Sequence, residues 1–164
     1  MDEDKYSRAV SVCFSGHRII PALQRNRLKQ RLVEEITKAY ADGYRIFYCG
    51  MAMGFDLLAA KAALSLKKEF PELRIVAVVP YRDQTARWNA WMKTDYDAVL
   101  RSVDEVILLS EHYYKGCLLH RNDYMVSHSS RLIAWYDGKP MGGTFYTCRK
   151  ARADGIRMIN LYNN

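Results

Sequence analysis

Short runs of hydrophobic residues recur along the chain, and a polar or glycine-containing segment follows each of them. The runs lie at 10–14, 44–49, 75–79, 106–109, 132–136 and 158–161. Most positions within them are apolar, without the alternation expected of a strand that faces water on one side. Near-continuous apolar strands are typical of parallel sheets covered on both faces. The runs therefore predict about six buried, mostly parallel strands.

Between these strands, hydrophobic residues return at the three- and four-residue spacing of amphipathic helices. One such helix carries Leu28, Leu32 and Ile36, and a second begins near Phe55. A third is predicted to begin with Gln84, Arg87 and Trp88, a fourth with Arg121 and Asn122, and a fifth to cover 144–154. Alternating strands and helices predict an α/β fold, a Rossmann-like doubly wound sheet with helices on both faces.

The chain length suits one domain with a full-sized core, since it has 164 residues of which 49% are hydrophobic and 26% charged. We expect a flexible polar tail at 1–8 and a single domain at 9–164. No apolar run approaches the roughly 20 residues that span a bilayer, and no basic-then-apolar leader is present. We therefore expect a cytoplasmic protein without a membrane partner.

The four cysteines are far apart, without the spacing of a metal site, and no histidine stands at ligand spacing beside them. We expect no metal. Cys13 and Cys49 lie in apolar strands and are predicted to be core residues, whereas Cys117 lies in a polar segment and is expected to be exposed.

The balance of charge is basic, with a formal net charge of +7. Such a balance favours anionic partners, nucleic acid among them. The positive residues are spread over several predicted helices and are interrupted by acidic ones such as Glu34 and Glu35. This dispersion is weak evidence for a dedicated nucleic-acid groove.

The unusual polar and glycine residues lie just after the predicted strands. Because parallel strands end at the same edge of a sheet, where ligands of such folds bind, we expect these segments to form one site. The candidate ligand-binding residues are Gly16, His17, Arg18, Gly50, Met51, Gly54, Asp56, Pro80, Gln84, Arg121, Asn122, Met125, Asp137, Gly142, Gly143 and Thr144.

The best phosphate-binding segment runs from Asp137 to Thr144, where a glycine turn leads into a helix. Such a turn lets backbone N–H groups approach an anion, and Arg121 would add a bidentate contact. The alternative is a turn that needs glycine for geometry alone. Asp56 either caps a helix or accepts a ribose hydroxyl, and Trp88 either stacks on a base or packs in the core. The dinucleotide pattern G-x-G-x-x-G is absent.

Five segments together resemble the SLOG superfamily, and within it the YpsA-like branch of small stand-alone proteins. They are SGHR, GMAMGFD, VVPYRDQTARW, GCLLHRNDYMVSHSSRLIAWYDG and GGT, in this order. The resemblance covers nearly the whole chain from about Val10 onward. It implies a Rossmann-like fold and a pocket for a nucleotide-derived ligand such as ADP-ribose, NAD or a nucleoside phosphate. It is also compatible with a homodimer.

Two relatives within the superfamily define the alternatives. Lonely Guy phosphoribohydrolases use an arginine in the motif R-[KN]-x-x-M, which Arg121 and Met125 match. This resemblance makes Arg121 the candidate catalytic residue. They also use a glutamate in P-G-G-x-G-T-x-x-E, where this chain has Thr147. Threonine cannot supply the carboxylate, which argues against the same nucleotide hydrolysis. The other relative, DprA, binds single-stranded DNA, and this chain shows no interleaved aromatic and basic track.

Overall fold

A computed structural model describes residues 5–162 of the chain. Within them, one parallel sheet contains β1 (Ser11–Gly16), β2 (Ile46–Cys49), β3 (Arg74–Val79), β4 (Glu105–Leu108), β5 (Arg131–Trp135) and β6 (Arg157–Asn160), in the order β4-β3-β2-β1-β5-β6. Every adjacent pair is parallel. The predicted Rossmann-like sheet is thereby confirmed, with each strand within two residues of its predicted position.

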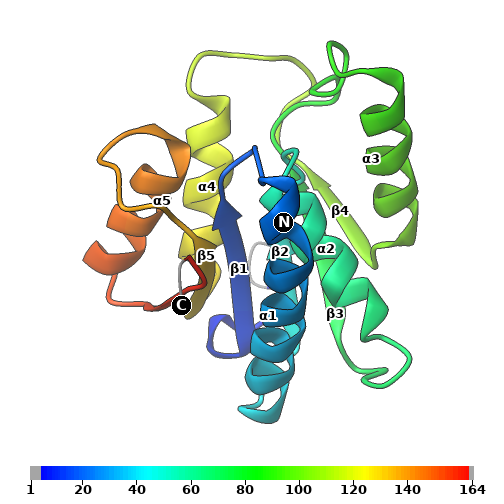
Figure 1. The fold of residues 1–164 in the computed structure, drawn as a ribbon. Helices are drawn as coiled ribbons and strands as arrows, with labels where there is room; N and C mark the ends of the chain where they lie inside the picture. Colours follow the sequence, from blue (N-terminus) through cyan, green and yellow to red (C-terminus); the bar gives the residue numbers. More distant parts are fainter. Residues whose placement is uncertain (1–4, 163–164) are drawn as a thin grey trace.

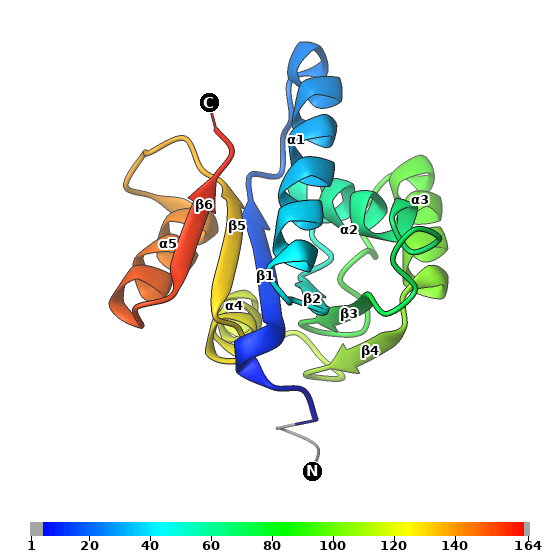
Figure 2. The same ribbon diagram turned by 90° about the horizontal axis from the view of Figure 1, so that it is seen from below.

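Helices cover the sheet in two layers (Figures 1 and 2). They are α1 (Ala22–Ala41), α2 (Phe55–Ser65), α3 (Ala90–Ser102), α4 (Cys117–Ser127) and α5 (Gly142–Ala153). The first three lie on one face and α4 and α5 on the other. Each layer closes a hydrophobic cluster against the strands, the larger one around Phe14, Phe47 and Phe55. The strands are apolar throughout because both faces are buried.

The direction in which the chain adds strands reverses once. From β1 the chain adds β2, β3 and β4 to one side, and it then returns to place β5 on the other side of β1. Crossovers on the two sides of such a reversal lie on opposite faces, so a crevice opens beyond the carboxyl ends of the two central strands. That edge is at the top of Figure 1, toward which the β1 arrow points.

Two helices begin elsewhere than the sequence predicts. α3 begins at Ala90, because the Asn89 side chain caps it by accepting from the Met92 N–H at 2.9 Å. The segment with Gln84 and Trp88 forms turns ahead of this cap. α4 begins at Cys117, so Arg121 lies one turn inside the helix rather than at its start.

The predicted tail at 1–8 is described in part, since residues 1–4 lie outside the described residues. Tyr6 donates its hydroxyl to Glu105 at 2.9 Å, and the Arg8 Nε donates to the Ser129 carbonyl at 2.9 Å. Residues 6 and 8 thus contact the domain. Among the helices that the structure describes, none is long and apolar enough to cross a membrane.

Candidate functional site

A cavity of about 450 Å³ lies at the crevice between the ends of β1 and β5. Its walls come from segments far apart in sequence: the end of β1, the β2–α2 loop, the first turns of α4, and the start of α5. More than half of the predicted site residues line it. These are Gly16, His17, Arg18, Asp56, Arg121, Asn122, Gly142, Gly143 and Thr144.

Arg121 forms the charged floor of this cavity, and its side chain is only 4% exposed. Its Nε donates to the Asn122 Oδ1 at 2.7 Å, and its Nη1 donates to the Gly50 carbonyl. Burial lowers the pKa of Arg121, whereas the nearby Asp56 raises it. No hydrogen bond within residues 5–162 uses Nη2. The guanidinium is therefore held in place with one donor nitrogen left for a ligand.

Asp56 is the acidic residue of the described cavity wall. Its Oδ2 accepts from the Ala52 N–H at 3.2 Å, and no side chain caps α2, so Asp56 does not have the predicted capping role. Burial raises the pKa of Asp56 to about 6, although Arg121 and the Ala52 N–H both lower it. A carboxyl group with this pKa is ionised at neutral pH and protonated in mild acid.

Gly50 makes room for this pair of side chains. A Cβ built at Gly50 would lie 2.8 Å from the Asp56 Oδ2 and 3.1 Å from the Arg121 Cδ. Glycine is needed at position 54 for a different reason. Its φ is +80°, and a Cβ there would lie 2.2 Å from the Arg18 carbonyl oxygen. The close approach at Gly54 is thus between two backbone segments of the protein.

Two helices direct their N-termini at the cavity. The caps of α4 and α5, Gly116 and Met141, make no side-chain cap hydrogen bond, and neither helix has an acidic residue in its first turn. Both caps and the residues that follow them line the cavity. The first N–H groups of a helix lack intrahelical partners and carry the positive end of its dipole. The cavity is therefore suited to an anion.

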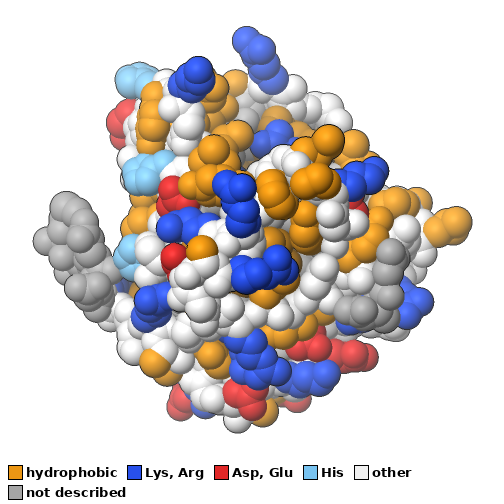
Figure 3. All heavy atoms as spheres, turned by 90° about the vertical axis from the view of Figure 1, so that its left-hand side faces the viewer, with side chains coloured by type: hydrophobic (Ala, Val, Ile, Leu, Met, Phe, Trp, Pro, Cys, Tyr) orange, Lys and Arg blue, Asp and Glu red, His pale blue; other side chains and the backbone are white. Residues whose placement is uncertain are grey.

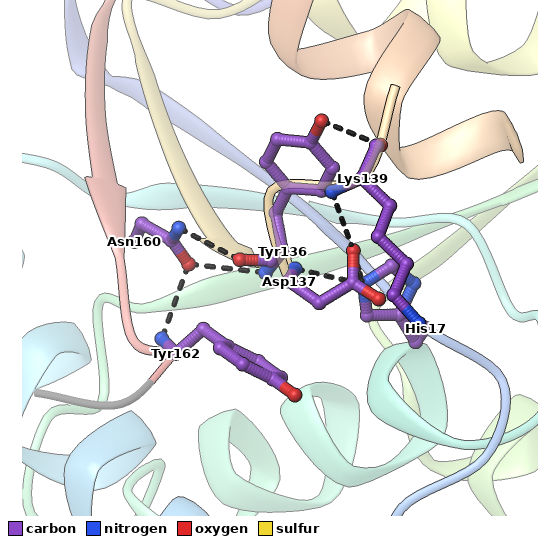
Figure 4. Close-up of polar contacts among 6 residues, drawn as sticks. All are labelled: His17, Tyr136, Asp137, Lys139, Asn160 and Tyr162. Atoms are coloured by element: carbon purple, nitrogen blue, oxygen red, sulfur yellow. Dashed lines mark hydrogen bonds and ion pairs between the residues drawn. The ribbon is translucent and has the colours of Figure 1, made fainter. Parts of the chain in front are cut away.

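The loop that carries the start of α5 is fastened on both sides (Figure 4). The Asp137 N–H donates to the His17 Nε2 at 2.9 Å, and the Asp137 Oδ1 accepts from the Lys139 N–H at 3.0 Å. From β6, the Asn160 amide pairs with both backbone groups of Tyr136, at 3.0 and 2.9 Å. His17 and Asp137 thereby position the glycine turn.

The other predicted site residues support the cavity from outside its wall. Gln84 donates to the Met51 carbonyl at 3.3 Å, which links two loops, and Met51 is fully buried with a φ of 61°. Pro80 and Met125 are buried and do not line the cavity. Gly50, Gly54 and Asp137 are also absent from its wall. Trp88 packs against the core, edge-on to Tyr96, as the helical spacing favoured.

Several wall residues were not predicted, among them Tyr113, Cys117, Leu119 and Met141. The expectation that Cys117 is exposed is wrong: it is 1% exposed and opens α4. Apolar side chains in loops carry no signal that separates a cavity wall from ordinary packing. Which loop residues line the cavity is decided by the tertiary contacts that hold the loops in place.

The position of Thr147 also bears on chemistry. Its side chain is fully buried, and its hydroxyl donates to the Gly143 carbonyl at 2.9 Å. The helix position at which a Lonely Guy enzyme has its glutamate is therefore used here for packing. Among residues 5–162, no group of His, Cys, Asp or Glu side chains is arranged to hold a metal ion.

Comparison with known proteins extends this picture. The family model YpsA, described as the YspA SLOG family, matches residues 22–160. A UPF0398 protein of Bacillus pumilus is 26% identical over 133 residues, which are 80% of this chain and 70% of that protein. The SPbeta prophage-derived protein YoqJ of Bacillus subtilis is 31% identical over 132 residues, 71% of this chain and 75% of YoqJ.

A further relative is the UPF0398 protein YpsA of Bacillus subtilis, which is 30% identical over 96 residues, 57% of this chain and 53% of YpsA. The family model spans every strand after β1 and every wall segment except the one at the end of β1. The chain therefore belongs to the YspA SLOG family, as a small YpsA-like protein.

Proposed function

We propose that the protein binds a nucleotide or nucleotide-derived ligand of the ADP-ribose, NAD or nucleoside phosphate type in this cavity. One observation carries the proposal: two helix N-termini and two arginines converge on one cavity at the reversal point of the sheet. Membership of a SLOG family supports a nucleotide-related function.

A phosphate would lie against the start of α5, where Gly142 and Gly143 present backbone N–H groups without an obstructing side chain. Arg121 and Arg18 both line the same cavity and could pair with the charge of the phosphate. Two arginines against one carboxylate leave the wall with an excess of positive charge, which favours a phosphate over a neutral ligand.

A ribose would find its partner in Asp56. The structure gives its Oδ1 no hydrogen-bond donor among residues 5–162, since only Oδ2 is used. A carboxylate accepts a pair of hydroxyl hydrogens well. The cavity volume of about 450 Å³ falls within the range of pockets that hold small ligands.

A thermal-shift panel with AMP, ADP-ribose, NAD, ribose 5-phosphate and a short DNA oligonucleotide tests the proposal. A ligand at about 100 times its dissociation constant stabilises a protein by about 2.7 kcal/mol. We expect a clear rise in Tm with nucleotides, and a smaller rise in Arg18→Ala. Arg18 is exposed, so its removal spares the fold, whereas Arg121→Ala also removes the contact with Gly50.

Arg101→Ala is the matched control, because Arg101 is an exposed arginine outside the cavity wall. It should leave the rise unchanged. If no nucleotide raises Tm at any concentration tested, the proposal is wrong.

A second candidate, hydrolysis of a nucleotide glycosidic bond, is favoured by one observation: Asp56 supplies a carboxylate in the cavity although Thr147 does not. Such a reaction adds water to release the free base and a ribose phosphate. Chromatography after long incubation with nucleoside monophosphates would detect the base. Release that is lost in Asp56→Asn supports hydrolysis, and an unchanged nucleotide pool leaves binding alone.

A further inference from the structure

The rim of the cavity differs in character from its floor. Tyr113 and Met141 both line the cavity, yet they are 64% and 69% exposed. Leu119, from the first turn of α4, is the third large apolar residue on this wall that remains exposed. The charged and polar groups Arg121, Asp56 and their neighbours are buried below. The buried part of the wall is therefore polar, whereas three large apolar side chains remain exposed on the same wall as the exposed Arg18.

The segment that carries Tyr113 is held between fixed points. The Tyr113 ring meets Tyr81 edge to face, with centroids 5.4 Å apart. Two residues earlier, Glu111 forms a two-bond ion pair with Arg82 at 2.7 and 2.8 Å. One residue later, the Tyr114 hydroxyl is 2.6 Å from the His120 Nδ1. These contacts connect the segment to its neighbours, and the Tyr113 ring remains exposed on the cavity wall.

Met141 is held at the same mouth by the opposite loop. Its N–H donates to the Lys139 carbonyl at 2.8 Å, and the Tyr136 hydroxyl donates to the same carbonyl at 2.7 Å. Figure 4 shows how His17 and Asn160 fasten the preceding part of this loop. Two independently anchored loops therefore expose an aromatic and a thioether side chain to the same cavity.

We propose that this rim, with Tyr113 as its stacking residue, is a subsite for the planar base of the ligand. The inference rests on the proposed function, because it needs the rest of the nucleotide to bind in the same cavity. A base over the Tyr113 face would cover apolar surface that is otherwise exposed, and stacking on an aromatic ring tolerates any base. Met141 and Leu119 add apolar contact without strong hydrogen-bonding groups.

This subsite recognises a base by its area rather than by its edge. Leu119 and Met141 cannot distinguish donors from acceptors on a base, so adenine and guanine should bind alike. A purine has the larger π-face and should bind more tightly than a pyrimidine. Ribose 5-phosphate, which has no base, should bind most weakly of the group.

The experiment compares AMP, GMP, CMP and ribose 5-phosphate by calorimetry. The wild-type protein should bind AMP about ten-fold more tightly than ribose 5-phosphate. This gain lies toward the lower end of what stacking of one base on an aromatic side chain contributes. Tyr113→Ala should bring the affinity for AMP close to that for ribose 5-phosphate and leave the latter unchanged. Tyr113→Phe, which keeps the ring, should retain the preference. Trp91→Ala, at an aromatic residue that is 75% exposed and lies outside this wall, is the control.

The possible failures are distinct. If Tyr113→Ala weakens AMP and ribose 5-phosphate equally, or weakens neither, the base subsite is wrong while phosphate binding stands. If the wild-type protein binds neither AMP nor ribose 5-phosphate, the base subsite is wrong, and the thermal-shift results with ADP-ribose and NAD decide whether the proposed function stands. Circular dichroism of each variant excludes loss of fold as the cause.

Discussion

Asp56 is the residue at which burial and charge oppose each other. The folded protein holds its carboxyl group in a buried position, and this burial raises its pKa from 3.8 to about 6. The folded state therefore binds the proton more tightly than the unfolded state. Ionising Asp56 in the folded protein costs on the order of 3 kcal/mol.

This pKa predicts an unusual pH dependence. Because the folded-state pKa lies above the unfolded value, the contribution of Asp56 to stability should rise as pH falls from about 7 to about 4. Asp56→Asn removes the titrating group while keeping an oxygen for the Ala52 N–H. Urea unfolding of both proteins at several pH values should show the wild type gaining stability relative to Asp56→Asn in mild acid. A relative loss below pH 6 would contradict the burial effect.

Gly54 is required by sterics rather than by a ligand. Its φ is +80°, and a Cβ would lie 2.2 Å from the Arg18 carbonyl oxygen, so Gly54→Ala should separate the end of β1 from α2. Gly43 offers a matched control, because its φ is +100° with nothing within 4 Å of a Cβ. Gly43→Ala should cost about 1 kcal/mol for conformation alone, and Gly54→Ala about 2 kcal/mol more. Equal losses in urea unfolding would rule out the clash.

At the level of single elements, the start of α5 joins the fold to the site. The helix begins at Gly142, after an extended cap that provides no side-chain acceptor. Its first N–H groups therefore remain available, and the loop before it is fixed by His17 and Asn160. An N-terminus that is rigid and uncapped is prepared to receive an anion with little reorganisation.

Gly143→Ala separates helix stability from anion binding. A Cβ at Gly143 would lie 3.7 Å from the Asn122 Nδ2, an ordinary contact, and alanine favours helices. Stability should therefore stay the same or rise by up to about 1 kcal/mol. Affinity for AMP should fall several-fold, because the new methyl group enters the cavity wall. Gly43→Ala, in the turn between α1 and β2 and outside this wall, should leave affinity unchanged. Unchanged AMP affinity in Gly143→Ala would place the phosphate elsewhere.

The strands were predictable as elements, whereas two helix starts were not. A strand buried on both faces must be apolar along its length, so 75–79 and 132–136 stood out without structural knowledge. The start of α3 was misplaced because Trp88 and Trp91 continue an apolar period across Asn89, where the cap interrupts the helix. The spacing of apolar residues does not indicate where a helix begins, whereas a capping side chain such as that of Asn89 does.

For the molecule as a whole, the formal net charge of +7 raises the question of nucleic acid. On the face shown in Figure 3, Lys and Arg side chains lie among hydrophobic and uncharged atoms and do not form one continuous track. Several of the basic residues are also paired, as Lys61 is with Asp95 at 2.6 Å and Arg131 with Asp42 at 3.0 Å. On this face, an extended strand would therefore find few neighbouring phosphate contacts.

Salt dependence tests this conclusion. We expect a short single-stranded oligonucleotide to bind weakly at about 150 mM salt, with less affinity than AMP. Any binding at low salt should fall steeply as salt rises, because it depends on counterion release. Fluorescence anisotropy across a salt series measures both. Oligonucleotide binding that is tighter than AMP binding at this salt concentration would favour a nucleic-acid function.

The pattern of apolar and polar residues along the sequence was enough to predict the strands, the α/β class and most of the segments that meet at the cavity. Strands buried on both faces must be apolar along their length, and the carboxyl ends of parallel strands lie at the same edge of the sheet. It did not predict that Arg121 would be held by Gly50, that Asp56 would be buried beside it, or that Tyr113 and Met141 would reach the same mouth. These relations join residues as far apart in sequence as Gly50 and Arg121. They arise from the reversal of strand order beside β1, which brings distant loops together and sets the desolvation, charge and exposure of each side chain.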